Sequence, residues 1–329
     1  MPESAERDAL RLSVWGNVFF AALGLGFGLI TQSEAILLDG FFSLIAFVMS
    51  LLTLRVSHLV TKGEDEVFHF GYYSFEPLLN SVKGLLILGL CAIALISAIG
   101  ALLHGGREIS LGWAVVYSIV AMIGALLLAV IQTRAAKRTG SPLLEVDARS
   151  WRIDGILSGA VLLAFIAAMF LERSQWSHLM PYVDPVLVAV LVLLVIPEPV
   201  RIVRDAIGEL LFISPEAAVQ EEVKSRFDEL VAGYPFEKSY LRMVRVGRVS
   251  YLLAHVVVSS EFRVGQVEEL DEIRRRINAG IQQLHPSWTV DTVFVADEEL
   301  AGQPPTQGDV GARSGDLVGE SEQSVEKLP

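Results

Sequence analysis

Six apolar runs shape this sequence, and each is long enough to cross a lipid bilayer. A transmembrane helix needs about 20 predominantly apolar residues. Windows of such length and hydropathy identify membrane spans, and they lie at Leu10–Ile30, Ala35–Leu54, Pro77–Leu103, Leu111–Ile131, Ile153–Leu171 and Pro185–Val203. We therefore expect an α-helical membrane protein whose larger domain is a six-transmembrane-helix bundle.

Composition supports this class and excludes others. Hydrophobic residues make up 52% of the chain and charged residues only 19%, as is typical of a membrane protein. The net charge of −12 argues against nucleic acid as a partner, because binding nucleic acid needs a basic surface. The single cysteine, Cys91, allows neither an internal disulfide nor a cysteine-built metal site. The sequence has no nucleophile–base pattern, phosphate loop or zinc-protease motif, so it does not indicate an enzyme.

Basic residues predict how the runs are oriented in the membrane. Lysine and arginine concentrate in the cytoplasmic loops and tails of membrane proteins. Only Arg107 and Arg173 fall in the odd-numbered loops between runs. The opposite side carries Arg7, Arg11, Arg55, Lys62, Arg134, Lys137, Arg138, Arg201 and Arg204. We expect an integral protein of the cell's inner membrane with both termini in the cytoplasm.

The composition becomes that of a soluble domain after Ser214. Amphipathic helix patterns begin near Val219 and Val267. Residues rich in β-formers lie at 240–246 and 249–258, on either side of a turn at Gly247, and again at 289–296. The order αββαβ predicts a small cytoplasmic α+β domain of the ferredoxin-like type, with both helices on one face of a sheet.

The expected division of the chain follows from these shifts in composition. Residues 1–9 form a cytoplasmic tail, 10–213 the membrane domain, and 214–300 the αββαβ domain. The last stretch, 301–329, consists largely of Gly, Pro, Ser, Gln and acidic residues. Such a composition buries too little apolar surface to fold, so we expect this tail to be disordered.

Polar residues mark the start of the fifth apolar helix. Asp147, Ser150, Asp154 and Ser158 fall at i, i+3, i+7 and i+11, which is one face of a helix. Ionised side chains in a membrane helix usually face a protein interior or a water-filled cavity, so this face can present oxygen atoms to a cation. The alternative is that the charges mark only the wet end of the helix, although Asp154 lies about two turns inside Asp147.

At this point the sequence resembles the cation diffusion facilitator family. The resemblance rests on Asn17 in the first run, SEAILLDGFFSL at 33–44, HFGYYSFEPL at 69–78, SWRIDGILS at 150–158, Asp184-Pro185, and the C-terminal domain. It implies a six-helix transporter with a cytoplasmic αββαβ domain. It also implies a homodimer that exports a divalent metal in exchange for protons. Asp184-Pro185 has the form of an N-cap followed by proline at the start of the sixth helix, and Pro197 and Pro199 are expected to kink or end that helix.

The sequence departs from the family at the transport site. The family takes two ligands from helix two and two from helix five, each pair at i and i+4. The matching positions here are Phe42 and Ala46, then Ser150 and Asp154, so only Asp154 is a strong ligand. Without histidines in either helix, the tetrahedral zinc site of the family cannot form.

The cytoplasmic metal positions of the family are also reduced. His255 and Asp297 match ligand positions of some members, but a third position, a histidine in those members, corresponds to Val295. The alternative for His255 is that of a structural histidine within its strand.

The resemblance also implies where a relocated site would lie. Helices two and five run antiparallel, and the family pairing sets Phe42 level with Asp154. Three residues back along helix two, Asp39 should lie near Leu157 and Ser43 near Ile153. We predict an oxygen-rich cluster slightly towards the outside, with Asp147 about two turns deeper as an access site; the cluster consists of Asp39, Ser43, Asp154 and Ser158. Hard oxygen ligands favour manganese, iron(II), magnesium or calcium over zinc, so we expect manganese or iron as the transported substrate and no resident cofactor.

Two alternatives weigh against this site. The family often carries an acidic residue at the position of Asp39 without using it as a ligand. Lys83 and Arg152 have charges that would neutralise Asp154 or Glu76, and they would then form a structural ion pair between helices three and five.

Two functions follow. The first is a secondary transporter that exports a divalent metal cation, with Asp154 as the central ligand; protonation of this carboxylate would release the metal and couple export to proton antiport. The second, favoured by Phe42 and Ala46, is a non-transporting membrane-anchored regulatory or scaffold dimer.

Overall fold

The computed structural model describes residues 2–60, 62, 64–139, 142–284 and 286–302. The chain divides into two compact units between Gly208 and Glu209, a few residues before the boundary expected at 213. The expectation of a disordered tail falls largely on 303–329, outside the described residues.

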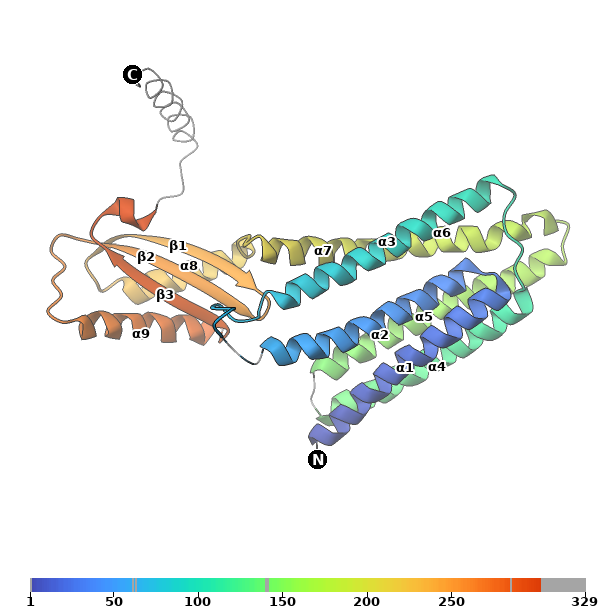
Figure 1. Cartoon of the computed structure of the whole chain (residues 1–329), viewed down its shortest axis with the longest axis horizontal. Helices are drawn as coiled ribbons and strands as arrows, with labels where there is room; N and C mark the ends of the chain where they lie inside the picture. The colour runs from blue at the N-terminus through green and yellow to red at the C-terminus, as the bar shows by residue number, and fades with distance from the viewer. Residues whose placement is uncertain (1, 61, 63, 140–141, 285, 303–329) are drawn as a thin grey trace, which may run out of the picture. The chain divides into compact units, whose positions relative to one another are not determined.

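The first unit contains the six membrane helices that the sequence predicts (Figure 1). Each is long and apolar enough to cross a bilayer, so this is an integral membrane protein. Their bounds are α1 Pro2–Thr31, α2 Glu34–Val60, α3 Phe75–Leu103, α4 Leu111–Thr139 and α5 Pro142–Glu172, followed by a sixth span built from η1 Ser177–Tyr182, α6 Val183–Val195 and α7 Pro197–Leu210.

The sixth span is interrupted where the prolines predicted it. α6 ends at Val195 and α7 begins at Pro197, with Ile196 in a turn between them. Proline cannot donate a backbone hydrogen bond within a helix, but it fits the first position of a new one. The expected kink is confirmed.

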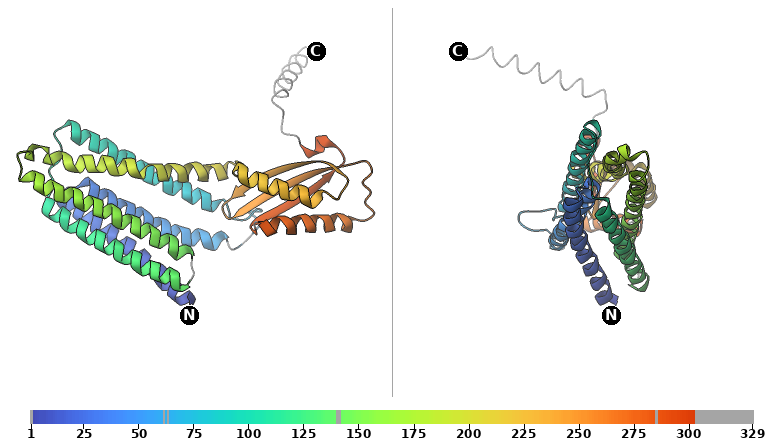
Figure 2. Two further views of the ribbon diagram at one scale, coloured as in Figure 1. Left: turned by 180° about the vertical axis from the view of Figure 1, so that it is seen from behind. Right: turned by 90° about the vertical axis from the view of Figure 1, so that its right-hand side faces the viewer.

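Close helix contacts bring α2 against α1. α1, α2, α4 and α5 lie side by side, while α3 runs beside α6 (Figures 1 and 2). A methyl group added at Gly24 would lie only 2.6 Å from the Cα of Gly40. The two backbones therefore touch at this point, as small residues permit in membrane helices. Gly40 follows Asp39 directly, so the contact fixes the depth and rotation of that carboxylate.

Asp184 differs from its expected role. It lies inside α6, where Tyr182 holds the N-cap position without a side-chain bond. Its buried carboxylate instead caps α2. Ser33 Oγ donates to Asp184 Oδ1 at 2.5 Å, and the backbone amide of Glu34 donates to Oδ2 at 3.0 Å. The prediction of a local cap was wrong, because the carboxylate satisfies the open amides of a helix distant in sequence.

A basic residue between α3 and α4 completes this cluster. Arg107 Nη1 lies 2.8 Å from Glu34 Oε2 and 3.4 Å from Asp184 Oδ2. Arg107 Nη2 donates to Ser97 Oγ at 3.1 Å, and the Ser97 hydroxyl donates to Glu34. This Asp184 network consists of Ser33, Glu34, Ser97, Arg107 and Asp184, and it ties together α2, α3, α6 and the loop before α4.

The second unit has the predicted order αββαβ. Its elements are α8 Ala217–Val231, β1 Phe236–Val246, β2 Val249–Val258, α9 Val267–Leu284, β3 Trp288–Val295 and a short η2 Glu298–Ala301. The sheet order is β1-β2-β3; β1 and β2 form an antiparallel hairpin at Gly247, and β3 runs parallel to β2. Phe227 of α8, Ile277 of α9 and Leu252 of β2 share one buried core, so the two contacting helices cover one face of the sheet.

Candidate functional site

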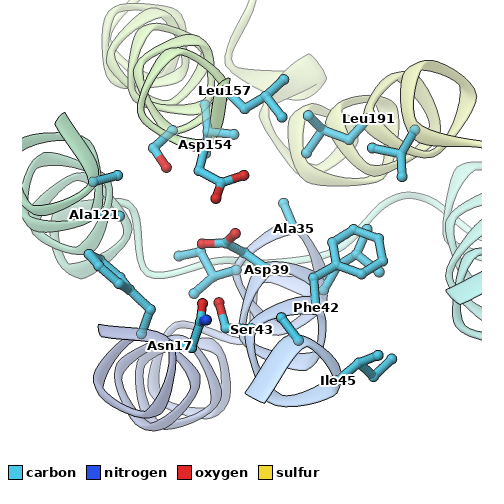
Figure 3. Close-up of a pocket in the computed structure, with 18 of the residues that line it drawn as sticks. Asn17, Ala35, Asp39, Phe42, Ser43, Ile45, Ala121, Asp154, Leu157 and Leu191 are labelled. Atoms are coloured by element: carbon cyan, nitrogen blue, oxygen red, sulfur yellow. The ribbon is translucent and has the colours of Figure 1, made fainter. Parts of the chain in front are cut away.

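A cavity of about 410 Å³ lies among the helices of the first unit. Two carboxylates face one another across it, Asp39 from α2 and Asp154 from α5 (Figure 3). Further polar side chains line the same cavity: Asn17, Ser43, Lys83, Tyr117, Ser118, Ser158 and Glu198. Most of the remaining lining is apolar. In such surroundings a polar group is costly unless it binds a ligand, water or another polar group.

Asp39 is held by a neighbouring helix. The hydroxyl of Tyr117, a residue of α4 that is only 2% exposed, donates to Asp39 Oδ2. The Tyr117 ring packs against Phe27 of α1, with centroids 5.9 Å apart. This bond fixes the orientation of Asp39 and engages Oδ2, whereas Oδ1 accepts no hydrogen bond from the residues described.

Asp154 is in a different state. It is exposed to the cavity, and among the described residues it makes no hydrogen bond and no ion pair. One turn earlier, Trp151 is buried and donates from Nε1 to Ser13 Oγ at 2.7 Å. The indole anchors α5 against α1, and Asp154 is left free to bind a cation or water.

The structure brings together four of the six predicted site residues. Asp39, Ser43, Asp154 and Ser158 all line the cavity, as does Leu157, beside which Asp39 was placed. Their role as ligands stays a prediction.

The other two predicted residues lie elsewhere. Ser150 is exposed and does not line the cavity. Asp147 lies beside the Ser13 hydroxyl, and its Oδ2 is buried without a hydrogen-bond partner in the described chain. Its role as an access site also stays a prediction.

The family's ligand positions on α2 do face the cavity. Phe42 and Ala46 line it, and in Figure 3 the Phe42 ring points away from the two carboxylates. These apolar groups cannot coordinate a metal. Asp39 and Ser43, which lie on neighbouring positions of the same helix, supply the oxygen atoms on this side.

Sequence reasoning missed several polar residues of this cavity. The sequence motif that contains Asn17 does not predict a role in the site, yet its amide points into the cavity (Figure 3). No sequence pattern indicates Tyr117, Ser118 or Glu198 as residues of the cavity. The one weak signal for Tyr117 is a tyrosine within an apolar run, because a buried tyrosine hydroxyl usually has a hydrogen-bond partner.

The ion pair expected between α3 and α5 does not form in the part of the chain that the structure describes. Lys83 lines the cavity, but Arg152 is exposed and lies outside it. Neither residue takes part in a salt bridge among the described residues. Glu198, the third acidic group of the cavity lining, pairs with Arg201 at 2.6 Å.

The polar groups of the cavity that could coordinate a cation offer oxygen atoms. Across residues 2–302, apart from the few undescribed positions, no three His, Cys, Asp or Glu side chains converge on one point. The cavity therefore combines two carboxylates with hydroxyl and amide oxygens. Such donors suit hard divalent cations that keep part of their water.

The second unit uses its candidate metal residues for other bonds. Arg242 Nη1 donates to His255 Nδ1 at 3.0 Å. Partial burial, and then the positive charge of Arg242, lower the pKa of His255. Asp297 caps η2 by accepting from the Glu299 amide at 3.0 Å. These contacts favour the structural alternative for His255.

Six membrane helices surround a cavity in which two carboxylates face one another, and acidic residues inside a membrane domain are typical of transporters and channels for ions. Residues 10–211 match the family model for the cation efflux transmembrane domain, which spans more than half of the chain. The protein belongs to the cation efflux family, and the resemblance seen in its motifs is confirmed.

Several curated proteins are similar to this chain. The manganese efflux system protein MneP of Bacillus subtilis is 22% identical over 223 residues, covering 68% of this chain and 74% of the relative. The magnetosome protein MamB of Magnetospira sp. is 24% identical over 266 residues, covering 78% and 85%. The cation-efflux pump FieF of Shewanella oneidensis is 28% identical over 136 residues, covering 41% and 45%.

Proposed function

We propose that this protein exports a divalent metal cation from the cytoplasm, with Asp39 and Asp154 as its charged ligands. The observation that carries the proposal is the pair of carboxylates facing across one cavity, of which Asp154 has no partner among the described residues. A divalent cation bound between them would neutralise both. Membership of the cation efflux family supports transport as the activity.

The proposed direction of transport, out of the cytoplasm, is supported by the difference between the two ends of the helix bundle. At the end predicted to face away from the cytoplasm, the Asp184 network joins α2, α3 and α6. Towards the predicted cytoplasmic end, the cavity is lined by Lys83 of α3 and by Glu198 and Ile202 of α7. This arrangement suits a carrier that loads its cation from the cytoplasm.

Proton antiport follows from the chemistry of the carboxylates. Protonation removes the negative charge that holds a cation, so protons and metal compete for Asp39 and Asp154. Protons arriving from outside would displace the metal there, and their release into the cytoplasm would restore the site. We further propose that the protein works as a homodimer in the inner membrane, with both termini in the cytoplasm.

The expected metal is manganese or iron(II). Zinc gains affinity from nitrogen and sulfur ligands, which the cavity lining lacks. Manganese accepts carboxylate, hydroxyl and water together, and one similar protein is named a manganese efflux protein.

The test is metal uptake into inverted vesicles that carry the full chain. Mn²⁺ should accumulate in wild-type vesicles, and Asp154→Ala should reduce uptake to background. Asp154 is one of the two charged ligands in this proposal, so its loss leaves a single carboxylate to hold the cation. Asp205→Ala is the matched control, because Asp205 is exposed on α7 and lies outside the cavity. Parental uptake by Asp154→Ala would end the proposal.

Metal preference needs a separate binding experiment. Protein carrying His255→Ala and Asp297→Ala removes any contribution from the second unit, and Mn²⁺ should then compete better than Zn²⁺. Tight zinc binding that survives Asp39→Ala would contradict both the relocated site and the preference for manganese over zinc.

The alternative function is that of a non-transporting regulatory or scaffold dimer, which Phe42 and Ala46 favour. It predicts a stable, folded dimer whose vesicles accumulate no divalent metal under any ion gradient.

A further inference from the structure

Lys83 places a positive charge in the cavity that contains the two carboxylates. The residue is half-buried on α3, and Ile87, one turn later, lines the same cavity. Its neighbour Gly84 packs against α7, where an added methyl group would lie 2.5 Å from Val203 Cγ2 and 3.2 Å from the Pro199 carbonyl oxygen. This close contact fixes the α3 backbone beside the cavity, so the Lys83 stem starts from a defined position.

The ammonium group of Lys83 forms no direct contact with an acidic side chain in the described part of the chain. Among the described residues it makes no hydrogen bond and no salt bridge. Glu198, the acidic residue of α7 in the same lining, is paired with Arg201. The remaining acidic groups of the cavity are Asp39 and Asp154. A partly buried charge without a partner is costly, and these two carboxylates are the acidic groups of the cavity that remain to balance Lys83.

The charge count of the cavity then changes with its occupant. Two carboxylates and one ammonium give a net charge of −1 when Glu198 is left with Arg201. A bound divalent cation turns this into +1. At an effective dielectric constant between about 20 and 40, a unit charge about 10 Å away changes the binding constant of a divalent ion by roughly tenfold to a few hundredfold.

We propose that Lys83 is a tethered competitor of the transported cation. Without metal, its ammonium group balances Asp39 and Asp154; with metal, its repulsion holds the affinity low enough for release. A transport site must bind its ion favourably enough to load it and weakly enough to let it leave. This inference rests on the proposed function, because it assumes that the two carboxylates hold the cation.

The experiment measures Mn²⁺ binding to the purified full-length protein. Lys83→Met removes the charge while keeping most of the side-chain length, and it should tighten binding by roughly tenfold to a few hundredfold. Lys83→Arg keeps the charge and should bind nearly as the wild type does. Arg152→Met is the matched control, since Arg152 is exposed and lies outside the cavity, where solvent screens its charge. Its affinity should change much less than that of Lys83→Met. Lys83→Gln serves in the same way if the methionine variant does not fold.

The kinetic consequence gives a second readout. Slower release should lower the maximal rate of Mn²⁺ uptake into inverted vesicles for Lys83→Met, although its half-saturating concentration falls. A structural role for Lys83 would lower the rate without tightening binding.

The outcomes separate this inference from the function on which it rests. Wild-type binding that depends on Asp154 but is unchanged by Lys83→Met would overturn the inference and leave the function standing. Equal tightening by Arg152→Met would also overturn it, because the effect would then be one of general charge. Absence of Asp154-dependent binding in both the wild type and Lys83→Met would overturn the two together.

Discussion

Replacing Tyr117 with phenylalanine removes one hydroxyl from the wall of the cavity and little else. Tyr117 is 2% exposed and its hydroxyl donates to Asp39 Oδ2. The ring also packs against Phe27, and phenylalanine keeps this contact. The substitution therefore asks what a single hydrogen bond to Asp39 contributes.

Two independent magnitudes converge if Asp39 binds the metal. A hydrogen bond to a charged group contributes about 1.5–3 kcal/mol, which is roughly a tenfold to 150-fold change in an equilibrium constant. Loss of a hydrogen-bond partner that orients a metal ligand typically costs about 10–100-fold in metal affinity. We therefore expect Tyr117→Phe to weaken Mn²⁺ binding by about 10–100-fold. If Asp39 were a structural acid only, the same loss would appear in the stability of the fold and not in metal affinity.

The assay compares Mn²⁺ titration with thermal unfolding for each purified protein. Tyr182→Phe is the matched control, because Tyr182 is half-buried beside α6 and lies outside the cavity lining. Its Mn²⁺ affinity should equal that of the wild type. An unchanged affinity in Tyr117→Phe, with a lowered melting temperature, would refute the assignment of Asp39 as a ligand.

Two further predictions concern stability. Asp184→Ala leaves Arg107 and the first amides of α2 without their buried acceptor, so it should lower the free energy of unfolding by about 3–5 kcal/mol. Ser33→Ala should lower it by only about 1 kcal/mol. Melting temperatures in detergent measure both effects, and equal effects would contradict the reasoning. Because partial burial and Arg242 lower the pKa of His255 below its usual 6.5, the unfolded chain takes up the proton first as pH falls. Urea unfolding of residues 214–302 should therefore show stability declining below about pH 6.5, and His255→Gln should flatten that decline.

The six spans and the αββαβ domain follow from patterns that are local and strong. Each apolar run is long enough that only its ends are uncertain. Two prolines in the sixth run mark its break at Ile196, because proline acts on its own helix. In the second unit, the alternation around Gly247 defines a hairpin from neighbouring residues alone.

The candidate site was only partly open to prediction. Asp39, Ser43, Asp154 and Ser158 share a cavity because antiparallel helices fix which turns lie level. Tyr117 lies in a helix that is apolar on all sides, and such a helix carries no periodic signal for its inner face. Its bond to Asp39 joins residues far apart in the sequence, so only the folded structure reveals it.

Asp184 shows how a local pattern can mislead. An aspartate before proline has the form of an N-cap for the helix that follows. In the structure the same carboxylate accepts bonds from Ser33 and Glu34 at the start of α2. Both arrangements satisfy open amides at a helix start, and no local sequence pattern distinguishes one from the other.

The charged residues of the first unit fall into two groups, one with its hydrogen bonds and ion pairs formed and one without. In the Asp184 network the carboxylates lie against donors, including Arg107 at 2.8 Å from Glu34. In the cavity, Asp154 has neither a hydrogen bond nor an ion pair among the residues described, and its negative charge is repelled by that of Asp39. Groups left in this state lower stability, and a ligand that binds only the folded protein restores it.

This contrast gives a final prediction, which runs against the usual destabilising effect of a substitution inside a protein. Asp154→Asn should raise the melting temperature of the metal-free protein, because it removes repulsion from Asp39 at similar volume. The gain should be about 0.5–2 kcal/mol, the range of single stabilising substitutions. The same variant should lose the stabilisation that Mn²⁺ gives the wild type. Asp205→Asn serves as the control and should change neither quantity. If Asp154→Asn instead melts lower without metal, Asp154 supports the fold, and its missing partner cannot be read as a vacant place for a cation.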